Sequence, residues 1–270
     1  MVRAVRGPGT TVDYQGVLVE LHRPNEDGVY LGVPRFPAEL EVGTDDIGPV
    51  ERQPIVRVSG SGGGEWNEPE VLLWLDRRNR THVIRFPNGE EMYGAQPFGD
   101  PDQVRFEPGA AVVMRLNEVP GAVELIEVSA EGDTVWHRHL RLEPRRLTPR
   151  MVTEAIEATL DRWASVFPEM PRTRLREKYE AALHRPEFVP PVEGPPILAS
   201  SGEVWLRSTE RSDTLRAYYV VQRGDVGGGP RRVLVPERLW LNDATRTHVW
   251  GVVLDSLERP QVVGRRLVLR

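Results

Sequence analysis

The feature that most constrains this chain is a recurring pattern of short apolar runs of β type, bounded by glycine, proline, asparagine and aspartate. Most of the 24 prolines lie between the runs, where a fixed φ angle and a missing N–H donor suit turns and strand ends. The pattern predicts a mainly β protein of antiparallel strands, arranged as a sandwich, a barrel or a propeller. The predicted strands are Val17–Leu21, Ile55–Val58, Val71–Leu75, His82–Phe86, Ala111–Leu116, Ala122–Val128, Thr134–Leu140, Val204–Arg207, Leu215–Gln222, Arg231–Val235, Val249–Leu254 and Gln261–Leu269.

Some of these strands begin with similar sequences. GDTVWHR at 132–138 is echoed by GEVWLR at 202–207, and NRTHVIR at 79–85 by TRTHVWG at 245–251. Self-similar units of strands and turns, about 40–50 residues long, are typical of propeller blades. The echoes are short and unevenly spaced, so a chance likeness of common strand residues is the alternative interpretation.

A helical segment interrupts the β pattern at residues 148–184. Thr148 and Pro149 are a capping hydroxyl and a first-turn proline, and apolar residues follow at steps of three and four. They are Val152, Ile156, Leu160, Trp163 and Phe167. This pattern predicts an amphipathic helix, and a stripe of this width is expected to pack against its own domain rather than to dock a partner.

A second, shorter helix is predicted around Leu175, Tyr179, Ala182 and Leu183, ending before Pro186. The proline-rich stretch 186–196 cannot be helical and is predicted to be an extended linker. The predicted organisation is therefore a single domain, with β sheets at 1–147 and 185–270 and a two-helix insertion at 148–184 between them.

Charge and composition exclude several classes of protein. The chain carries 35 basic and 40 acidic side chains, interspersed, so its sequence has no basic footprint for nucleic acid. It has no cysteine, and its only lysine, Lys178, falls in a polar helical stretch. No segment reaches the roughly 20 apolar residues of a membrane span, and the sequence begins without the apolar core of a signal peptide.

A longer succession of motifs resembles a known group of proteins. It comprises QPFGD (96–100), GDTVWHRHLRLEP (132–144), LTPRMVTEAI (147–156), RPEFVPPVEGPPI (185–197), GEVWLR (202–207) and HVWGVVLDSLERPQVVGRRL (248–267). The order is similar to that of uncharacterised bacterial six-bladed β-propeller proteins of the TolB-like and NHL-like superfamily. The resemblance covers residues 70–270 and implies a secreted or periplasmic location. Because the expected N-terminal blades and signal are missing, about four blades of an incomplete ring are predicted.

Function is predicted mainly from this resemblance. It implies a monomeric, non-catalytic binding or scaffolding module for an unknown protein, peptide or carbohydrate ligand, with no cofactor and no catalytic or metal-binding residue assigned. Two alternatives stay open. One is a metal-dependent hydrolase similar to gluconolactonases, whose oxygen ligands for a divalent cation would come from Asp100, Asp102, Asn242 and Asp243. The other is a truncated fragment without independent function.

The remaining candidate residues have ordinary structural interpretations as well. His137 and His139 would share one face of a strand and could form half of a metal site. Ser200 and Ser201 precede a strand and lack the G-x-S-x-G elbow of hydrolases. The glycine-rich segments 60–64 and 227–229 are predicted to be loop tips, because neither leads into a helix or carries a P-loop lysine.

The tryptophans give a further expectation. Five of them, Trp74, Trp136, Trp205, Trp240 and Trp250, fall in or beside predicted strands and are expected to pack in the core. Trp66 lies next to the first glycine-rich segment and is the best candidate for an exposed contact.

Overall fold

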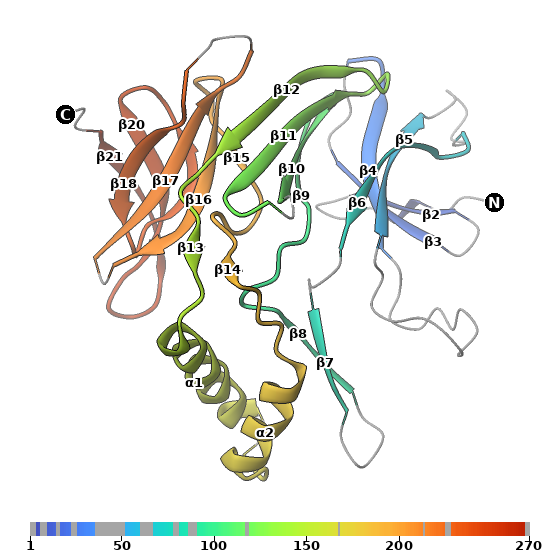
Figure 1. Cartoon of the computed structure of the whole chain (residues 1–270). Helices are drawn as coiled ribbons and strands as arrows, with labels where there is room; N and C mark the ends of the chain where they lie inside the picture. The colour runs from blue at the N-terminus through green and yellow to red at the C-terminus, as the bar shows by residue number, and fades with distance from the viewer. Residues whose placement is uncertain are drawn as a thin grey trace.

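A computed structural model describes residues 4–5, 10–14, 17–22, 26–35, 52–59, 67–77, 81–85, 91–116, 119–166, 168–212, 214–224 and 228–267. In these residues the chain forms several antiparallel sheets and one helical hairpin (Figure 1). The mainly β prediction is confirmed at this level. Within each of the four larger sheets the strands pair in sequence order, so each of these sheets is a simple meander.

The N-terminal sheet has six strands, and a separate hairpin follows it. The six are β1 (Ala4–Val5), β2 (Thr10–Tyr14), β3 (Val17–Leu21), β4 (Val29–Arg35), β5 (Arg52–Ser59) and β6 (Glu70–Asp76). The hairpin consists of β7 (Thr81–Arg85) and β8 (Glu91–Ala95).

Three further sheets account for most of the remaining chain. The central sheet contains β9 (Gln103–Glu107), β10 (Ala110–Leu116), β11 (Ala122–Ser129) and β12 (Thr134–Arg141). The next contains β15 (Ile197–Leu198), β16 (Glu203–Arg211), β17 (Leu215–Gln222) and β18 (Arg231–Pro236). The C-terminal sheet contains β19 (Trp240–Ala244), β20 (His248–Leu254) and β21 (Pro260–Arg266).

The β9–β12 and β15–β18 sheets contribute buried apolar side chains from both of their faces. Successive side chains of a strand point to opposite faces. Val204 and Leu206 on β16 accordingly join the β9–β12 sheet in one cluster, while Trp205 between them joins Leu241 of the C-terminal sheet in another. In the β9–β12 sheet, Ile126 packs with residues of β4 to β6 in the same way. The four sheets are therefore stacked face to face in chain order through apolar clusters.

The two helices lie at one end of the sheets, beside β7 (Figure 1). Helix α1 (Pro149–Val166) begins as predicted, because the Thr148 hydroxyl accepts a hydrogen bond from the backbone N–H of Met151 at 3.3 Å. Helix α2 (Arg172–Ala182) ends before Pro186, as predicted. The apolar stripe of α1 and that of α2 form one cluster with Ile84, Phe98 and Val189, so the helices are buried on their own chain.

Residues 186–196 are extended and not helical, as predicted, but they also pair with strands and so are more than a linker. Residues Phe188–Val189 form strand β14, which pairs with β13 (Arg145–Arg146), and Val192 forms a β-bridge with Ser208 of β16. Prolines lack an N–H donor, but the carbonyls of Pro190 and Pro191 accept hydrogen bonds from Thr209. The stretch is extended, yet it is held along β16 by these bonds and by the buried Val192 side chain.

Gly121, in the turn between β10 and β11, gives a stability prediction. Its φ is +77°, and a Cβ at this position would lie 2.2 Å from the carbonyl oxygen of Leu142. Gly121→Ala is therefore expected to lower the free energy of unfolding by at least about 2 kcal/mol, measured by urea denaturation. Gly202→Ala is the matched control, since its φ is +80° but no atom lies within 4 Å of its Cβ. Equal losses in both variants would mean that backbone strain, rather than the steric contact, decides the effect.

Candidate ligand-binding pocket

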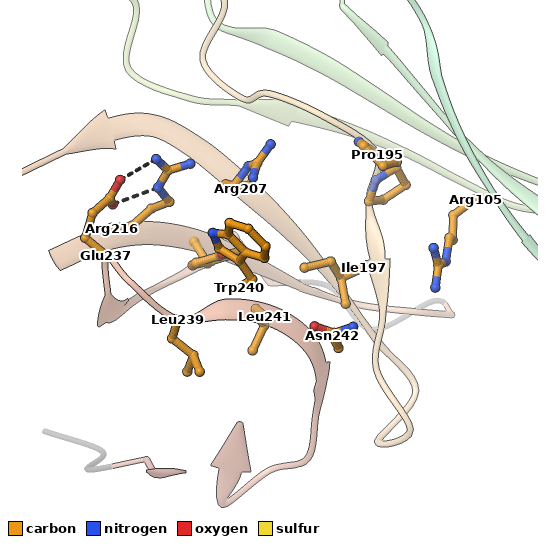
Figure 2. Close-up of a pocket in the computed structure, with 12 residues that line it drawn as sticks. Arg105, Pro195, Ile197, Arg207, Arg216, Glu237, Leu239, Trp240, Leu241 and Asn242 are labelled. Carbon is orange, nitrogen blue, oxygen red and sulfur yellow. Dashed lines mark hydrogen bonds and ion pairs between the residues drawn. The ribbon is translucent and has the colours of Figure 1, made fainter. Parts of the chain in front are cut away.

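A pocket of about 290 Å³ lies where the edge strands of three sheets come together (Figure 2). These strands are β9, β15 and β19, each of which is the first strand of its sheet along the chain. Strands β16 and β17, the two prolines before β15 and the connection between β18 and β19 complete the walls. The lining residues are Arg105, Pro195, Pro196, Ile197, Arg207, Arg216, Tyr218, Glu237, Leu239, Trp240, Leu241 and Asn242.

A β-bulge places the polar Asn242 at this pocket. In the pairing of β19 with β20, Leu241 lies opposite Gly251 and Asp243 lies opposite Trp250, so Asn242 has no partner residue. A bulge of this kind redirects a side chain and is common beside binding sites. Gly251 is required on the facing strand, because a Cβ there would lie 2.2 Å from the carbonyl oxygen of Trp240.

Trp240 supplies the large aromatic surface of the pocket. It is the first residue of β19, and its side chain is 63% exposed although it lines the pocket. Figure 2 shows its indole ring near the middle of the group, between the Arg216–Glu237 pair and Ile197. An indole held in this way offers a flat apolar platform to a ligand.

One wall of the pocket is an ion-pair network that is already satisfied. Arg216 binds Glu237 through two hydrogen bonds of 2.8 and 2.5 Å, and it contacts Glu193 at 2.5 Å. The hydrogen bond to Glu237 raises the pKa of Arg216 above its ordinary value. Arg207 shares Glu193 at 3.3 Å. Burial raises the pKa of the neighbouring Tyr218 hydroxyl, which therefore stays neutral at physiological pH.

Arg105, on the far side of the pocket, differs from these two arginines. Figure 2 shows it across Ile197 and Asn242 from the Arg216–Glu237 pair. Its side chain is exposed, and within the part of the chain that the structure describes no carboxylate forms an ion pair with it. Its guanidinium fork is therefore available to a carboxylate or phosphate that enters the pocket.

Of the four residues predicted as oxygen ligands for a cation, only Asn242 lines the pocket. The Asp102 carboxylate is buried and accepts hydrogen bonds from the backbone N–H of Asp76 and from Arg115. Burial raises the pKa of Asp102 above its usual range. Asp243 accepts the backbone N–H groups of Ser200 and Ala244. Both carboxylates are thus engaged by hydrogen bonds within the fold, and Asp100, which is half-buried, is not among the lining residues.

The tryptophan prediction is confirmed for some residues and wrong for others. Trp136 and Trp205 are buried between sheets, as expected. Trp74 is 50% exposed because β6 is an edge strand, and Trp240 is exposed at the pocket. Trp250 is half-buried and stacks on His248. Trp66 lies outside the described residues.

The other predicted features are local structure where they can be described. The hydroxyls of Ser200 and Ser201 donate hydrogen bonds to the Ala244 carbonyl and to Glu203, as expected of a turn. Gly228 and Gly229 lie in the connection between β17 and β18, which supports the loop interpretation. The segment 60–64 lies outside the described residues. Lys178 lies half-buried on α2.

The two histidines of β12 do share one face, as predicted, and Glu124 of β11 joins them. Glu124 was not predicted, because it lies on a different strand from the two histidines. The register of the β11–β12 hairpin, which sets Glu124 opposite His139, is the signal that could have found it.

No family model, curated protein or solved structure matches this chain. Neither α1 nor α2 combines the length and the apolar composition that crossing a bilayer requires.

Proposed function

We propose that the chain is a non-catalytic binding module on a propeller-like scaffold, and that its pocket binds a small ligand carrying a carboxylate beside a flat apolar face. Each of the stacked meanders would be a blade, with β9, β15 and β19 as innermost strands. In keeping with the family resemblance, we further propose that it acts as a monomer in a secreted or periplasmic location.

The observation that carries this proposal is that the available Arg105 and the exposed Trp240 line the same pocket. A guanidinium binds a carboxylate through two parallel hydrogen bonds, which fixes both the position and the orientation of the ligand. The indole face adds apolar contact, and the bulged Asn242 amide can both donate and accept a hydrogen bond. Polar and apolar residues contribute equally to the lining, and a few convergent polar groups beside apolar surface are typical of small-molecule sites.

The alternative, a metal-dependent hydrolase of the lactonase type, has less support at this position. Such a site needs several oxygen ligands that converge on one cation. Among the lining residues the single carboxylate is Glu237, and Arg216 already neutralises it. Asp102 and Asp243 are held by backbone N–H groups.

Calorimetric titration of the full chain tests the proposal with four probes. Glucuronate and phenylacetate carry a carboxylate beside a sugar or aromatic face, whereas glucose and acetate each carry only one of the two features. We expect at least one of the first pair to bind, and to bind more tightly than either glucose or acetate. A preference for glucuronate would indicate an acidic carbohydrate, and a preference for phenylacetate an aromatic acid.

Two variants assign the binding to the pocket. Arg105→Gln is expected to weaken binding of the preferred probe about 10- to 100-fold, because hydrogen bonds to a charged group contribute about this much to affinity. Trp240→Ala is expected to weaken it about 3- to 10-fold. Arg265→Gln and Trp74→Ala are matched controls, because they remove an exposed arginine and an exposed tryptophan away from the pocket. The proposal fails if no probe binds, or if the controls weaken binding as much as the pocket variants.

A further inference from the structure

A second cluster of chemically active side chains lies on the β9–β12 sheet, away from the pocket-lining residues. It consists of Glu124 on β11 and of His137 and His139 on β12. One ligand atom from each residue lies within 4.8 Å of the others. None of the three lines the pocket described above.

Strand geometry explains why the three side chains meet. His137 and His139 are two residues apart on β12, so both point to the same face of the sheet. Glu124 lies directly opposite His139 in the antiparallel register, and His137 lies opposite Ile126, one diagonal step away. Side chains at directly opposed and diagonal positions are close enough to interact.

Both imidazoles converge on the same carboxylate oxygen. The Nε2 atom of His137 lies 2.7 Å from Oε1 of Glu124, and the Nε2 atom of His139 lies 4.0 Å from it. The centroids of the two imidazole rings are 4.4 Å apart, and the rings meet edge to face. Ligands of a tetrahedral zinc ion lie about 3.3 Å from each other, and the two observed N–O distances bracket this value.

The carboxylate of the cluster is more buried than its two imidazoles, which suits an ion entering from solvent. The Glu124 side chain is only 16% exposed and is fixed in the sheet, whereas His137 and His139 are 43% and 67% exposed. The imidazoles can therefore adjust by small rotations about χ1 and χ2, and the outer coordination positions face water. Arg115, opposite Glu124 on β10, is the cation facing the cluster from that strand, and Asp102 already pairs with it at 3.3 Å.

We infer that Glu124, His137 and His139 form a binding site for a divalent transition-metal ion of the zinc class. Two neutral imidazoles and one carboxylate suit Zn²⁺, and three protein ligands leave a position for water. This site differs in place and in ligand type from the all-oxygen site that the lactonase resemblance implies, and it does not depend on ligand binding at the pocket.

The test is calorimetric titration of the chelator-treated full chain with Zn²⁺, together with visible absorption of the Co²⁺ form. We expect one ion per chain with a dissociation constant below about 1 mM. His139→Asn and Glu124→Gln should each weaken Zn²⁺ binding at least about tenfold, because even the loss of a supporting residue can cost this much. The double variant His137→Asn/His139→Asn should abolish binding and the Co²⁺ absorption bands.

His184→Asn is the matched control, because it removes a histidine of the helical segment and leaves the cluster intact. The inference is overturned if the chain takes up no Zn²⁺, or if His184→Asn weakens binding as much as the cluster variants do. Thermal melts of each apo variant verify folding, and the exposed positions of both cluster histidines make these substitutions mild for stability.

Discussion

Replacing Trp205 with alanine is expected to lower the free energy of unfolding by about 3–5 kcal/mol, a large part of the roughly 5–15 kcal/mol that holds a domain folded. Trp205 is completely buried in the cluster that joins the β15–β18 sheet to the C-terminal sheet. Its removal leaves a cavity between two sheets that cannot close without moving both. Urea denaturation followed by far-ultraviolet circular dichroism measures the change.

The same substitution at Trp240 is the matched control. Trp240 belongs to the same sheet pair but is mostly exposed, so Trp240→Ala is expected to change the free energy of unfolding by less than about 1 kcal/mol. A similar loss in both variants would contradict the distinction between a core tryptophan and a pocket tryptophan.

The second large effect is expected for Arg223, which follows β17. Its guanidinium binds the Glu127 carboxylate on β11 through hydrogen bonds of 3.1 and 2.6 Å, and contacts Glu107 at 2.9 Å. The Glu127 side chain is mostly buried, so Arg223→Met would leave a carboxylate without a counter-charge between two sheets. We expect a loss of about 2–3 kcal/mol in the free energy of unfolding, measured by urea denaturation.

Two further variants isolate the cause of this loss. Arg223→Met/Glu127→Gln removes the unpaired charge, and it is expected to recover part of the lost stability. Arg232→Met breaks the exposed pair with Glu210 and should cost less than about 1 kcal/mol. If Arg232→Met were as destabilising as Arg223→Met, burial of the Glu127 carboxylate would not be the cause.

Several strands were predicted from their own apolar pattern, but others were not, among them the apolar β4 and the more polar β9. Val204 and Leu206 alternate with Trp205 in a clear β pattern, and β16 forms there. Strand β9 (QVRFE) has one apolar residue fewer than the run Val204–Leu206 of β16. It was not predicted, because pairing with β10, rather than its own pattern, stabilises it. The helices were predicted well, since capping and period are local signals that need no partner.

The pocket could be predicted only in part. Asn242 was identified for its amide oxygen, but the bulge that directs it depends on the register with β20, which local sequence does not encode. Trp240 was expected in the core, and this prediction failed because the exposure of a strand residue depends on which sheet faces the strand. Arg105 gave no signal at all in a chain with 35 basic side chains, and it matters only because three edge strands meet beside it.

The most direct test of the proposed function is a crystal structure of the chain soaked with whichever of glucuronate and phenylacetate binds in solution. The proposal predicts the ligand carboxylate within hydrogen-bond distance of the Arg105 guanidinium and the ligand ring against the Trp240 indole. A ligand bound elsewhere, or Arg105 held by a carboxylate of the chain itself with the pocket closed, would contradict it.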